Sequence, residues 1–446
     1  MKQKISSKNK STCAIICEFN PMHTGHIFLI NKAKELTNSD YMIGIMSGNF
    51  SQRSEICVLD KYTRSEIATH NGLDLIINLP TCFCTNNAEV FALSSIKILN
   101  QIGLNFLAFG VETLNINAFF TLAKFMIDEP KEFKTKLKEN LNTGLSYFNA
   151  YTKTIKENSS FFDNNMISDL VKILTRPNNT LALEYVKALI KTNSKIKPIF
   201  IQRVDNYNLN GIKENYVSAN YIRKNLIENS FEKVSQFLPR NSHIFFKENL
   251  QKYSEIFDIK KPIVNANKLL SKTSKKSDNK TYNEYQIPNI LKTLILYKIK
   301  SLNLNEVKKI YSVSEGLENK IKNSAKQTNC FDVFYQSLIT KRYKQNKINS
   351  ILLNCLLEID KETINKLYTI KNNIYAKILA INPKKREILS VINTKYLICR
   401  KKDIENAKLN SFNKKLVEIE NTANIVYNLI FNTHLNENDW YNKTRL

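Results

Sequence analysis

CAIICEFNPMHTGHIFL, residues 13–29, is the stretch that decides the fold. The short apolar run at residues 13–17 predicts a buried strand, which the polar and proline-containing residues 18–21 bring to an end. The motif at residues 23–26 then leads into an apolar segment that predicts a helix over about residues 28–36. A strand, a turn and a helix N-terminus form a site for phosphates, because free backbone N–H groups and the helix dipole attract anions.

Two histidines flank Gly25 in this turn. His23 and His26 are three residues apart, so both lie on one face of the first helical turn. Each imidazole can donate hydrogen bonds to phosphate oxygens and offset charge in a transition state, and Gly25 allows a ligand to approach the backbone closely. The alternative is that each histidine is only a surface or hydrogen-bonded structural residue. The chain has five histidines in all, at positions 23, 26, 70, 243 and 434, and the placement of two of them here favours a functional site.

The H-x-G-H motif after a strand resembles that of the HxGH nucleotidyltransferase superfamily. Six ordered blocks resemble, more narrowly, the bacterial tRNA(Met) cytidine acetate ligase family. They are EFNPMHTGH (18–26), MSGNFSQR (46–53), DKYTRSEIA (60–68), GLDLIINLP (72–80), NAEVFAL (87–93) and LAFGVE (107–112). The resemblance is dense over the first 112 residues, patchier to about residue 224 and thin beyond.

This resemblance implies an enzyme with two steps. ATP and acetate would give acetyl-adenylate and pyrophosphate, and the acetyl group would pass to N4 of the wobble cytidine of elongator tRNA(Met), with Mg²⁺ accompanying ATP. His23 and His26 are the predicted catalytic residues. The predicted ATP-binding residues are Ile16, Cys17, Glu18, Phe19, Asn20, Pro21, Met22, His23, Thr24, Gly25, His26, Ile27, Phe28, Leu29, Gly110, Asn178 and Arg203. Because acetate is already ionised at pH 7, positioning and charge stabilisation suffice for the first step, and the sequence has neither a Ser/His/Asp pattern nor a P-loop.

Composition bounds the class of protein. The chain has 446 residues, 43% of them hydrophobic and 24% charged, which is typical of a globular protein of two or three domains. No apolar run approaches the roughly 18 residues of a membrane span, and the basic N-terminus does not continue into a signal peptide, so we expect a cytoplasmic protein with no membrane partner. The eight cysteines form no CxxC and no zinc spacing, so we expect neither zinc, nor any other protein-bound metal, nor disulfides.

The formal net charge is +26, from 66 Lys and Arg against 40 Asp and Glu. A polyanionic partner explains this charge, and RNA fits better than a membrane because no basic amphipathic anchor stands out. The alternative is a compositional bias toward Lys, Asn and Ile. Six of the nine glycines lie between Gly25 and Gly110, at the turns of the expected nucleotide fold.

Strands and helices alternate in the first half of the chain. Strands are predicted at residues 13–17, 41–46, 73–77, 106–109 and 198–201, with helices at 60–71, 88–101 and 181–191 and a mostly helical stretch at 113–178. Such alternation predicts an α/β fold with a parallel sheet, whose ligands bind beyond the carboxyl ends of the strands. We therefore predict a Rossmann-like parallel-sheet nucleotidyltransferase domain over residues 1–227, followed by a basic, mostly α-helical tRNA-binding region over residues 228–446.

Four further side chains are candidates for the nucleotide site. Asn178 precedes the predicted helix and is either its N-cap or, as the resemblance implies, an ATP contact. Arg203 at the end of the fifth strand suits a phosphate or base contact. Ser218 and Arg223 resemble a phosphate-clamping segment of HxGH enzymes, but an N-cap and a surface charge remain equal alternatives, so neither is in the predicted site.

The C-terminal half has helical spacing, interrupted by a polar linker at residues 271–280. A helix beginning near residue 348 carries Ile348, Ile351, Leu352, Cys355 and Leu356 on one face. Cations before a helix N-terminus oppose its dipole, so the basic run there suggests an RNA backbone contact, with a solvated charge run as the alternative. Lys341, Arg342, Lys344 and Lys347 are the predicted tRNA-binding residues.

Three departures from the family pattern concern substrate contacts. The usual ELP after the third strand is Asn78-Leu79-Pro80, the usual FGSE is Phe109-Gly110-Val111-Glu112, and the C-terminal basic motif has Lys and Asn where arginines are commoner. Two other functions stay open. One is a small-molecule adenylyltransferase, which does not explain a basic helical half, and the other is a non-catalytic RNA-binding protein, against which the intact His23, Gly25 and His26 argue.

Overall fold

The computed structural model describes residues 10–203, 212–213, 216–257, 287–340, 343–369, 374–435 and 444. Its centre is a seven-stranded sheet in the order β5-β4-β1-β2-β3-β8-β9. The strands are β1 (Thr12–Cys17), β2 (Tyr41–Ser47), β3 (Leu75–Leu79), β4 (Phe106–Val111), β5 (Lys197–Gln202), β8 (Ala376–Ile381) and β9 (Leu397–Ile398). The first five run parallel, in register from Cys13 opposite Met42 on one side and Phe106 on the other. The predicted parallel α/β sheet is thus confirmed.

The central strands lack hydrophobic alternation because helices cover both faces of the sheet. Every residue of β2 and β3 is buried, as are five of the six residues of β1. A parallel strand in such a position needs a continuous apolar run rather than an alternating one. Residues 13–17 and 41–46 have that run, so their pattern predicted the two strands to within one residue.

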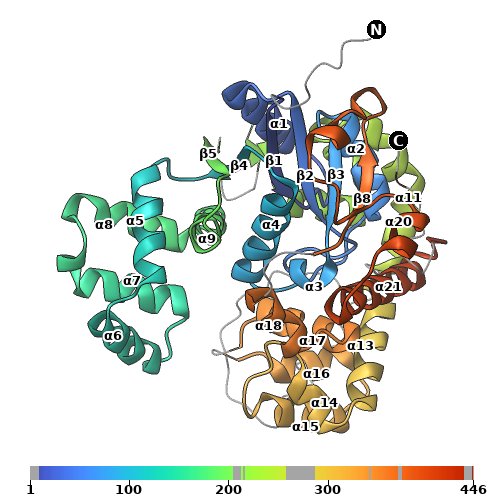
Figure 1. Cartoon of the computed structure of the whole chain (residues 1–446). Coiled ribbons are helices and arrows are strands. Elements are labelled where there is room, and N and C mark those ends of the chain that lie inside the picture. The colour runs from blue at the N-terminus through green and yellow to red at the C-terminus, as the bar shows by residue number, and fades with distance from the viewer. Residues whose placement is uncertain are drawn as a thin grey trace.

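The sheet is completed by the C-terminal half of the chain, which the sequence pattern did not reveal. β8 pairs antiparallel with β3, from Leu75 opposite Ile381 to Ile77 opposite Ile378, and β9 pairs with β8. In Figure 1 the orange β8 lies beside the blue β3. The described part of residues 228–446 is therefore mostly helical but also supplies one edge of the central sheet, while the boundary at residue 227 remains a prediction.

Helices surround this sheet and extend from it in two directions. Figure 1 shows α5–α8 projecting on one side and α13–α18 lying below the strands, with α21 between the sheet and α13. In chain order they are α1 (Thr24–Thr37), α2 (Lys61–His70), α3 (Thr81–Cys84), α4 (Ala88–Ile102), α5 (Ile116–Ile127), α6 (Lys131–Asn142), α7 (Tyr147–Glu157), α8 (Asn164–Thr175), α9 (Pro177–Lys191), α10 (Ala219–Ile227), α11 (His243–Ile256), α13 (Asn289–Ser301), α14 (Leu304–Lys309), α15 (Leu317–Gln327), α16 (Phe331–Leu338), α17 (Gln345–Leu357), α18 (Lys361–Thr369), α19 (Ile388–Val391), α20 (Lys401–Asn406) and α21 (Ser411–Phe431). A two-stranded ribbon joins β6 (Ile212–Lys213) to β7 (Tyr216–Val217).

The apolar face predicted for residues 348–356 is confirmed, since all five of its residues are buried in α17. The proposed linker at residues 271–280 lies outside the described residues. Among the helices that the structure describes, none combines the length and the hydropathy needed to cross a bilayer.

Candidate active site at the carboxyl edge of the sheet

The turn between β1 and α1 places the two histidines. Phe19 has a left-handed backbone (φ 47°), and the Asn20–Pro21 peptide bond is cis. The helix begins at Thr24, not near residue 28 as predicted, because His23 is its N-cap. Histidine is not among the usual capping residues, so no ordinary helix-start signal stands at this position.

Hydrogen bonds to the backbone fix the protonation of both imidazoles. His23 Nδ1 accepts from the backbone N–H of Gly25 at 3.1 Å, and His26 Nδ1 accepts from the backbone N–H of His23 at 3.2 Å. A ring nitrogen that accepts a hydrogen bond carries no proton, so in each neutral ring the proton is on Nε2. The two rings lie with centroids 3.8 Å apart. The helix N-terminus therefore presents two fixed Nε2–H donors in addition to its own N–H groups.

The surroundings keep both histidines neutral. Burial, together with the positive charges of Arg203 and Arg223, lowers the pKa of His23 to about 3. Burial also lowers the pKa of His26 well below its usual value, as do His23 and Arg203. The positive surroundings that disfavour protonation of the histidines would favour binding of an anion at this site.

Arg203 reaches the histidines across Gly110. The Arg203 backbone N–H donates to Val111 O at 2.8 Å, which continues the pairing of β4 with β5. A Cβ at position 110 would lie 3.0 Å from Arg203 Cγ and 3.3 Å from its Cδ. Because position 110 is glycine, the Arg203 side chain can lie across β4. The sequence alone could not show this contact.

Asn178 does not cap a helix, so the capping alternative is wrong. α9 begins with Pro177 in its first turn and Arg176 as N-cap, which makes Asn178 an internal residue. Its Nδ2 donates to Glu112 Oε1 at 2.7 Å, and the other oxygen of Glu112 is buried without a hydrogen-bond partner. Asn178 and Glu112 therefore stand together at the end of β4, close to Gly110.

Arg223 belongs to this edge, although it was left outside the predicted site. It is 9% exposed, donates to Asn20 O at 2.7 Å and pairs with Glu55 at 2.8 Å, so it is not a surface charge. Ser218 is the N-cap of α10, because its hydroxyl accepts from Tyr221 N at 3.1 Å. The resemblance of residues 218–223 to a phosphate-clamping segment did point to Arg223. An arginine in a polar stretch is equally typical of an exposed surface residue, so the sequence alone could not decide between the two.

Arg64 is a second arginine at this edge that sequence reasoning missed. It is 1% exposed, and its guanidinium donates to the backbone oxygens of Glu18, Ser47, Gly48 and Leu59. The oxygens of Glu18, Ser47 and Gly48 lie at the ends of β1 and β2, so Arg64 joins the two strand ends that bound the site. Because its N–H groups donate to carbonyl oxygens of the protein itself, we assign Arg64 a structural role.

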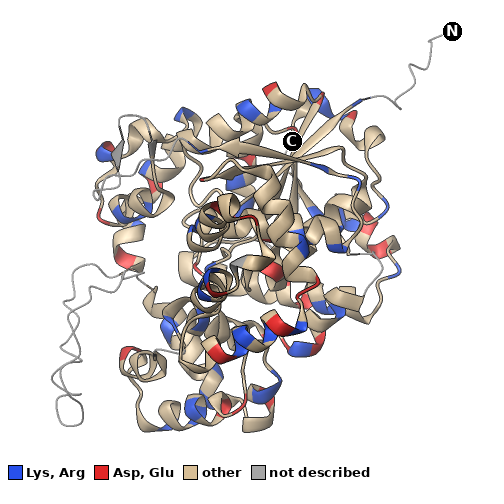
Figure 2. Ribbon diagram, turned by 90° about the vertical axis from the view of Figure 1, so that its left-hand side faces the viewer, with Lys and Arg blue, Asp and Glu red and all other residues tan. Residues whose placement is uncertain are grey.

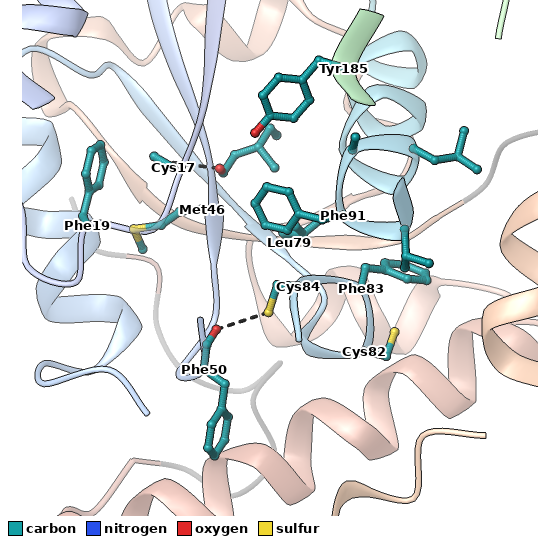
Figure 3. Close-up of a cluster of buried hydrophobic side chains, with 14 of the residues drawn as sticks. Cys17, Phe19, Met46, Phe50, Leu79, Cys82, Phe83, Cys84, Phe91 and Tyr185 are labelled. Atoms are coloured by element: carbon teal, nitrogen blue, oxygen red, sulfur yellow. Dashed lines mark hydrogen bonds between the residues drawn. The ribbon is translucent and has the colours of Figure 1, made fainter. Parts of the chain in front are cut away.

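Below the site lies an apolar cluster drawn in Figure 3. Cys17 Sγ contacts Ile45 O at 3.6 Å, Cys84 Sγ contacts Phe50 O at 3.3 Å, and the Tyr185 hydroxyl points toward Cys17. Of the predicted ATP-binding residues, Cys17, Phe19 and Met22 are buried in the core, so only their backbone can face a ligand. The side chains of Ile16, Ile27, Phe28 and Leu29 are partly buried against the same core.

The structure describes two of the four predicted tRNA-binding residues. Lys341 and Arg342 lie outside the described residues, whereas Lys344 is the exposed N-cap of α17 and Lys347 is exposed in its first turn. Among the described residues, no group of three His, Cys, Asp or Glu side chains could hold a metal ion.

Comparisons with known proteins agree with this geometry. Residues 10–442 match a family model described as HIGH Nucleotidyl Transferase. A tRNA(Met) cytidine acetate ligase of Clostridium novyi (strain NT) is 35% identical over 387 residues, covering 85% of this chain and 87% of that protein. One of Thermoanaerobacter sp. (strain X514) is 32% identical over 94% of both chains.

Two solved structures of Thermotoga maritima TmcAL are similar over nearly the whole chain. The apo form has a TM-score of 0.80 at 26% identity and covers 98% of this chain and 99% of its own. The form bound with alpha-thio ATP has a TM-score of 0.77 at 26% identity, with 96% of both chains covered. The chain therefore belongs to the tRNA(Met) cytidine acetate ligase family of HIGH nucleotidyl transferases.

Proposed function

We propose that this ligase activates acetate with ATP and acetylates N4 of the wobble cytidine of elongator tRNA(Met). In the first step a carboxylate oxygen of acetate attacks the α-phosphorus of ATP, which gives acetyl-adenylate and releases pyrophosphate. In the second step the cytidine N4 attacks the acetyl carbonyl carbon, which gives N4-acetylcytidine and AMP. Family relatives carry the name of this activity, and the T. maritima relative binds an ATP analogue.

The observation that carries the proposal is the pair of fixed imidazole donors at the N-terminus of α1. Both Nδ1 atoms accept backbone N–H groups, so both Nε2–H groups are left to donate to phosphate oxygens. Arg203 and Arg223 add positive charge beside His23. Hydrogen bonds preorganised in a site with little water stabilise charge that develops on the phosphates, and this is the support that adenylate formation needs.

The protein's basic character supports an RNA substrate. The net charge of +26 is distributed over both halves of the molecule, where Figure 2 shows lysines and arginines with acidic residues among them. At the start of α17, Lys344 and Lys347 are exposed, which suits contact with a phosphate backbone. The tRNA would thus be held by residues of the helical half while its cytidine reaches the edge of the sheet.

Labelled acetate tests the proposal. The protein would be incubated with ATP, radiolabelled acetate and total bacterial tRNA, and the tRNA digested to nucleosides. We expect label in N4-acetylcytidine for the wild type, and a loss of about a hundredfold or more in His26→Ala, since it removes one preorganised donor. His70→Ala is the matched control, because His70 is exposed at the end of α2.

Two results would contradict the proposal. If ATP is consumed with another small acceptor and no label enters tRNA, the chain is a small-molecule adenylyltransferase. If tRNA binds while ATP remains unchanged under all conditions, the chain is an RNA-binding protein on an inactive nucleotide fold.

A further inference from the structure

The second step of the proposed reaction needs a proton acceptor that the histidines cannot be. When N4 bonds to the acetyl carbon, the nitrogen must lose one proton while the bond from that carbon to the AMP phosphate oxygen breaks. The imidazole lone pairs of His23 and His26 already accept backbone N–H groups, so their Nε2–H groups can only donate. A positioned base of this kind typically contributes 10²–10⁴-fold in rate.

Four carboxylates from different elements meet at this edge, and three of them are engaged. Glu55 is paired with Arg223 at 2.8 Å, and Glu420 is paired with Lys61 at 2.6 Å. Glu112 accepts from Asn178 with one oxygen and has the other buried. Glu18, the residue that directly follows β1, is the fourth.

One oxygen of Glu18 is fixed and the other is available. Oε1 accepts the backbone N–H of Gln52. Within the described ranges, no hydrogen bond reaches Oε2, and this oxygen is not among the buried unpartnered atoms. Glu18 is only partly buried, so its second oxygen is not sealed off in the core.

The fixed oxygen is held by a chain of contacts that ends in the helical half. The Gln52 side chain donates to Asn86 O at 3.1 Å, and Asn86 Oδ1 accepts from Asn354 of α17 at 2.9 Å. Asn86 is 2% and Asn354 0% exposed, so the contact between these two residues is shielded from water. The exposed Lys344, a predicted tRNA contact, is the N-cap of the same helix α17. The helix expected to contact tRNA therefore also helps to hold Glu18 in place.

The charges around Glu18 suit a base. Burial raises the pKa of Glu18 and the charge of Glu55 adds to the rise, while the Gln52 N–H, Arg223 and Arg64 partly offset it. Arg223 also acts on the pKa of His23, so one arginine neighbours both the histidine and the carboxylate. The remaining ionisable neighbours stay neutral at pH 7, because burial raises their pKa: Cys17, Cys57, Cys84 and Tyr185.

We propose that Glu18 is the catalytic base of the acetyl-transfer step and takes the N4 proton on its Oε2. The N4–carbon bond forms, the carbon–oxygen bond to AMP breaks with its electron pair going to the phosphate oxygen, and the proton later leaves Glu18 for solvent. The proposal rests on the function proposed above. It distinguishes the two steps, since adenylate formation requires no base, whereas the transfer requires the Glu18 carboxylate to accept a proton.

The test separates the two steps in Glu18→Gln. Glutamine keeps the acceptor for Gln52 N–H and nearly the same shape, but it cannot take a proton. We expect acetyl transfer to tRNA to fall about a hundredfold or more, and acetate-dependent exchange of pyrophosphate into ATP to fall much less, because the first step needs no proton acceptor. The rise of the wild-type transfer rate with pH should disappear in Glu18→Gln, and Glu18→Asp should restore part of the rate. Glu35→Gln is the control, since Glu35 lies exposed on α1.

Each other outcome has a definite meaning. Transfer within a few-fold of wild type in Glu18→Gln would overturn the proposal. An equal loss of exchange and transfer would also overturn it, because Glu18 would then serve the nucleotide site as a whole. A wild-type protein without acetate-dependent exchange would instead overturn the proposed function, whatever the variants do.

Discussion

At the scale of single residues, the site depends on groups that the fold holds in one protonation state. His23 is 7% exposed, and its pKa is lowered to about 3 by burial and by two arginines. The sequence indicated that His23 and His26 act together. It could not indicate that each ring accepts a backbone N–H, because that depends on where the helix begins.

The low pKa of His23 predicts a destabilisation in mild acid. Its folded-state pKa lies below 6.5, so between about pH 3 and 6.5 the unfolded state binds more protons, and the free energy of unfolding falls as the pH drops through this range. From pH 6.5 to 5 this amounts to about 2 kcal/mol. His23→Asn keeps a capping acceptor without the titration, so urea unfolding at both pH values should show a smaller loss in the variant. An equal loss in both proteins would show that His23 titrates normally.

Gly110→Ala is predicted to weaken ATP binding through Arg203. The added Cβ would lie 3.0 Å from Arg203 Cγ, so the arginine must move. We expect about a tenfold rise in the ATP dissociation constant, or about 1.4 kcal/mol, by isothermal titration. If the effect passes through the arginine, Gly110→Ala adds little to an Arg203→Ala background. Full additivity of the two substitutions would contradict this account.

At the scale of elements, α21 is joined to the strand ends by buried polar contacts. Glu420 pairs with Lys61 at 2.6 Å and accepts the backbone N–H of Thr81 at 2.8 Å, and Asn424 accepts from Asn49 at 3.0 Å. Lys61 and Glu420 are 0% and 3% exposed at their side chains. These contacts connect residues more than 300 positions apart, which no local sequence pattern can reveal.

Breaking this ion pair on one side should be costly. Glu420→Gln leaves the Lys61 ammonium buried without its counter-charge, and we expect the free energy of unfolding to fall by about 3–5 kcal/mol. Glu139→Gln is the control, because its pair with Lys136 at 2.9 Å is exposed and should cost less than about 1 kcal/mol. Similar losses for the two variants in urea unfolding would contradict the burial of the Lys61–Glu420 pair.

At the scale of the whole molecule, the five parallel strands were predictable and the completion of the sheet was not. Continuous apolar runs between turn residues located β1 to β5 to within two residues at most ends. β8 has a similar apolar run but lies beyond a long helical stretch, and only its pairing with β3 makes it part of the nucleotide fold. In the site, the motif residues and Arg203 were predicted, whereas Arg223 and Arg64 depend on long-range packing.

The shared sheet predicts that the N-terminal half does not fold alone. A fragment ending at residue 257 would expose the edge of β3 and lose the partner of the buried Lys61. We expect it to lack a cooperative thermal transition by circular dichroism, while co-expression with residues 287–446 restores one. A cooperative transition of the fragment alone would show that β8 and α21 are dispensable for the fold.

The most direct test of the central claim follows an oxygen atom from acetate. The protein would be given ATP, tRNA and acetate labelled with oxygen-18 in both carboxylate positions, and the AMP analysed by mass spectrometry. If acetate attacks the α-phosphorus and N4 then attacks the carbonyl carbon, each AMP formed with N4-acetylcytidine carries one oxygen-18 atom. AMP without the label, or ADP as the product, would contradict the acetyl-adenylate and with it the role assigned to His23 and His26.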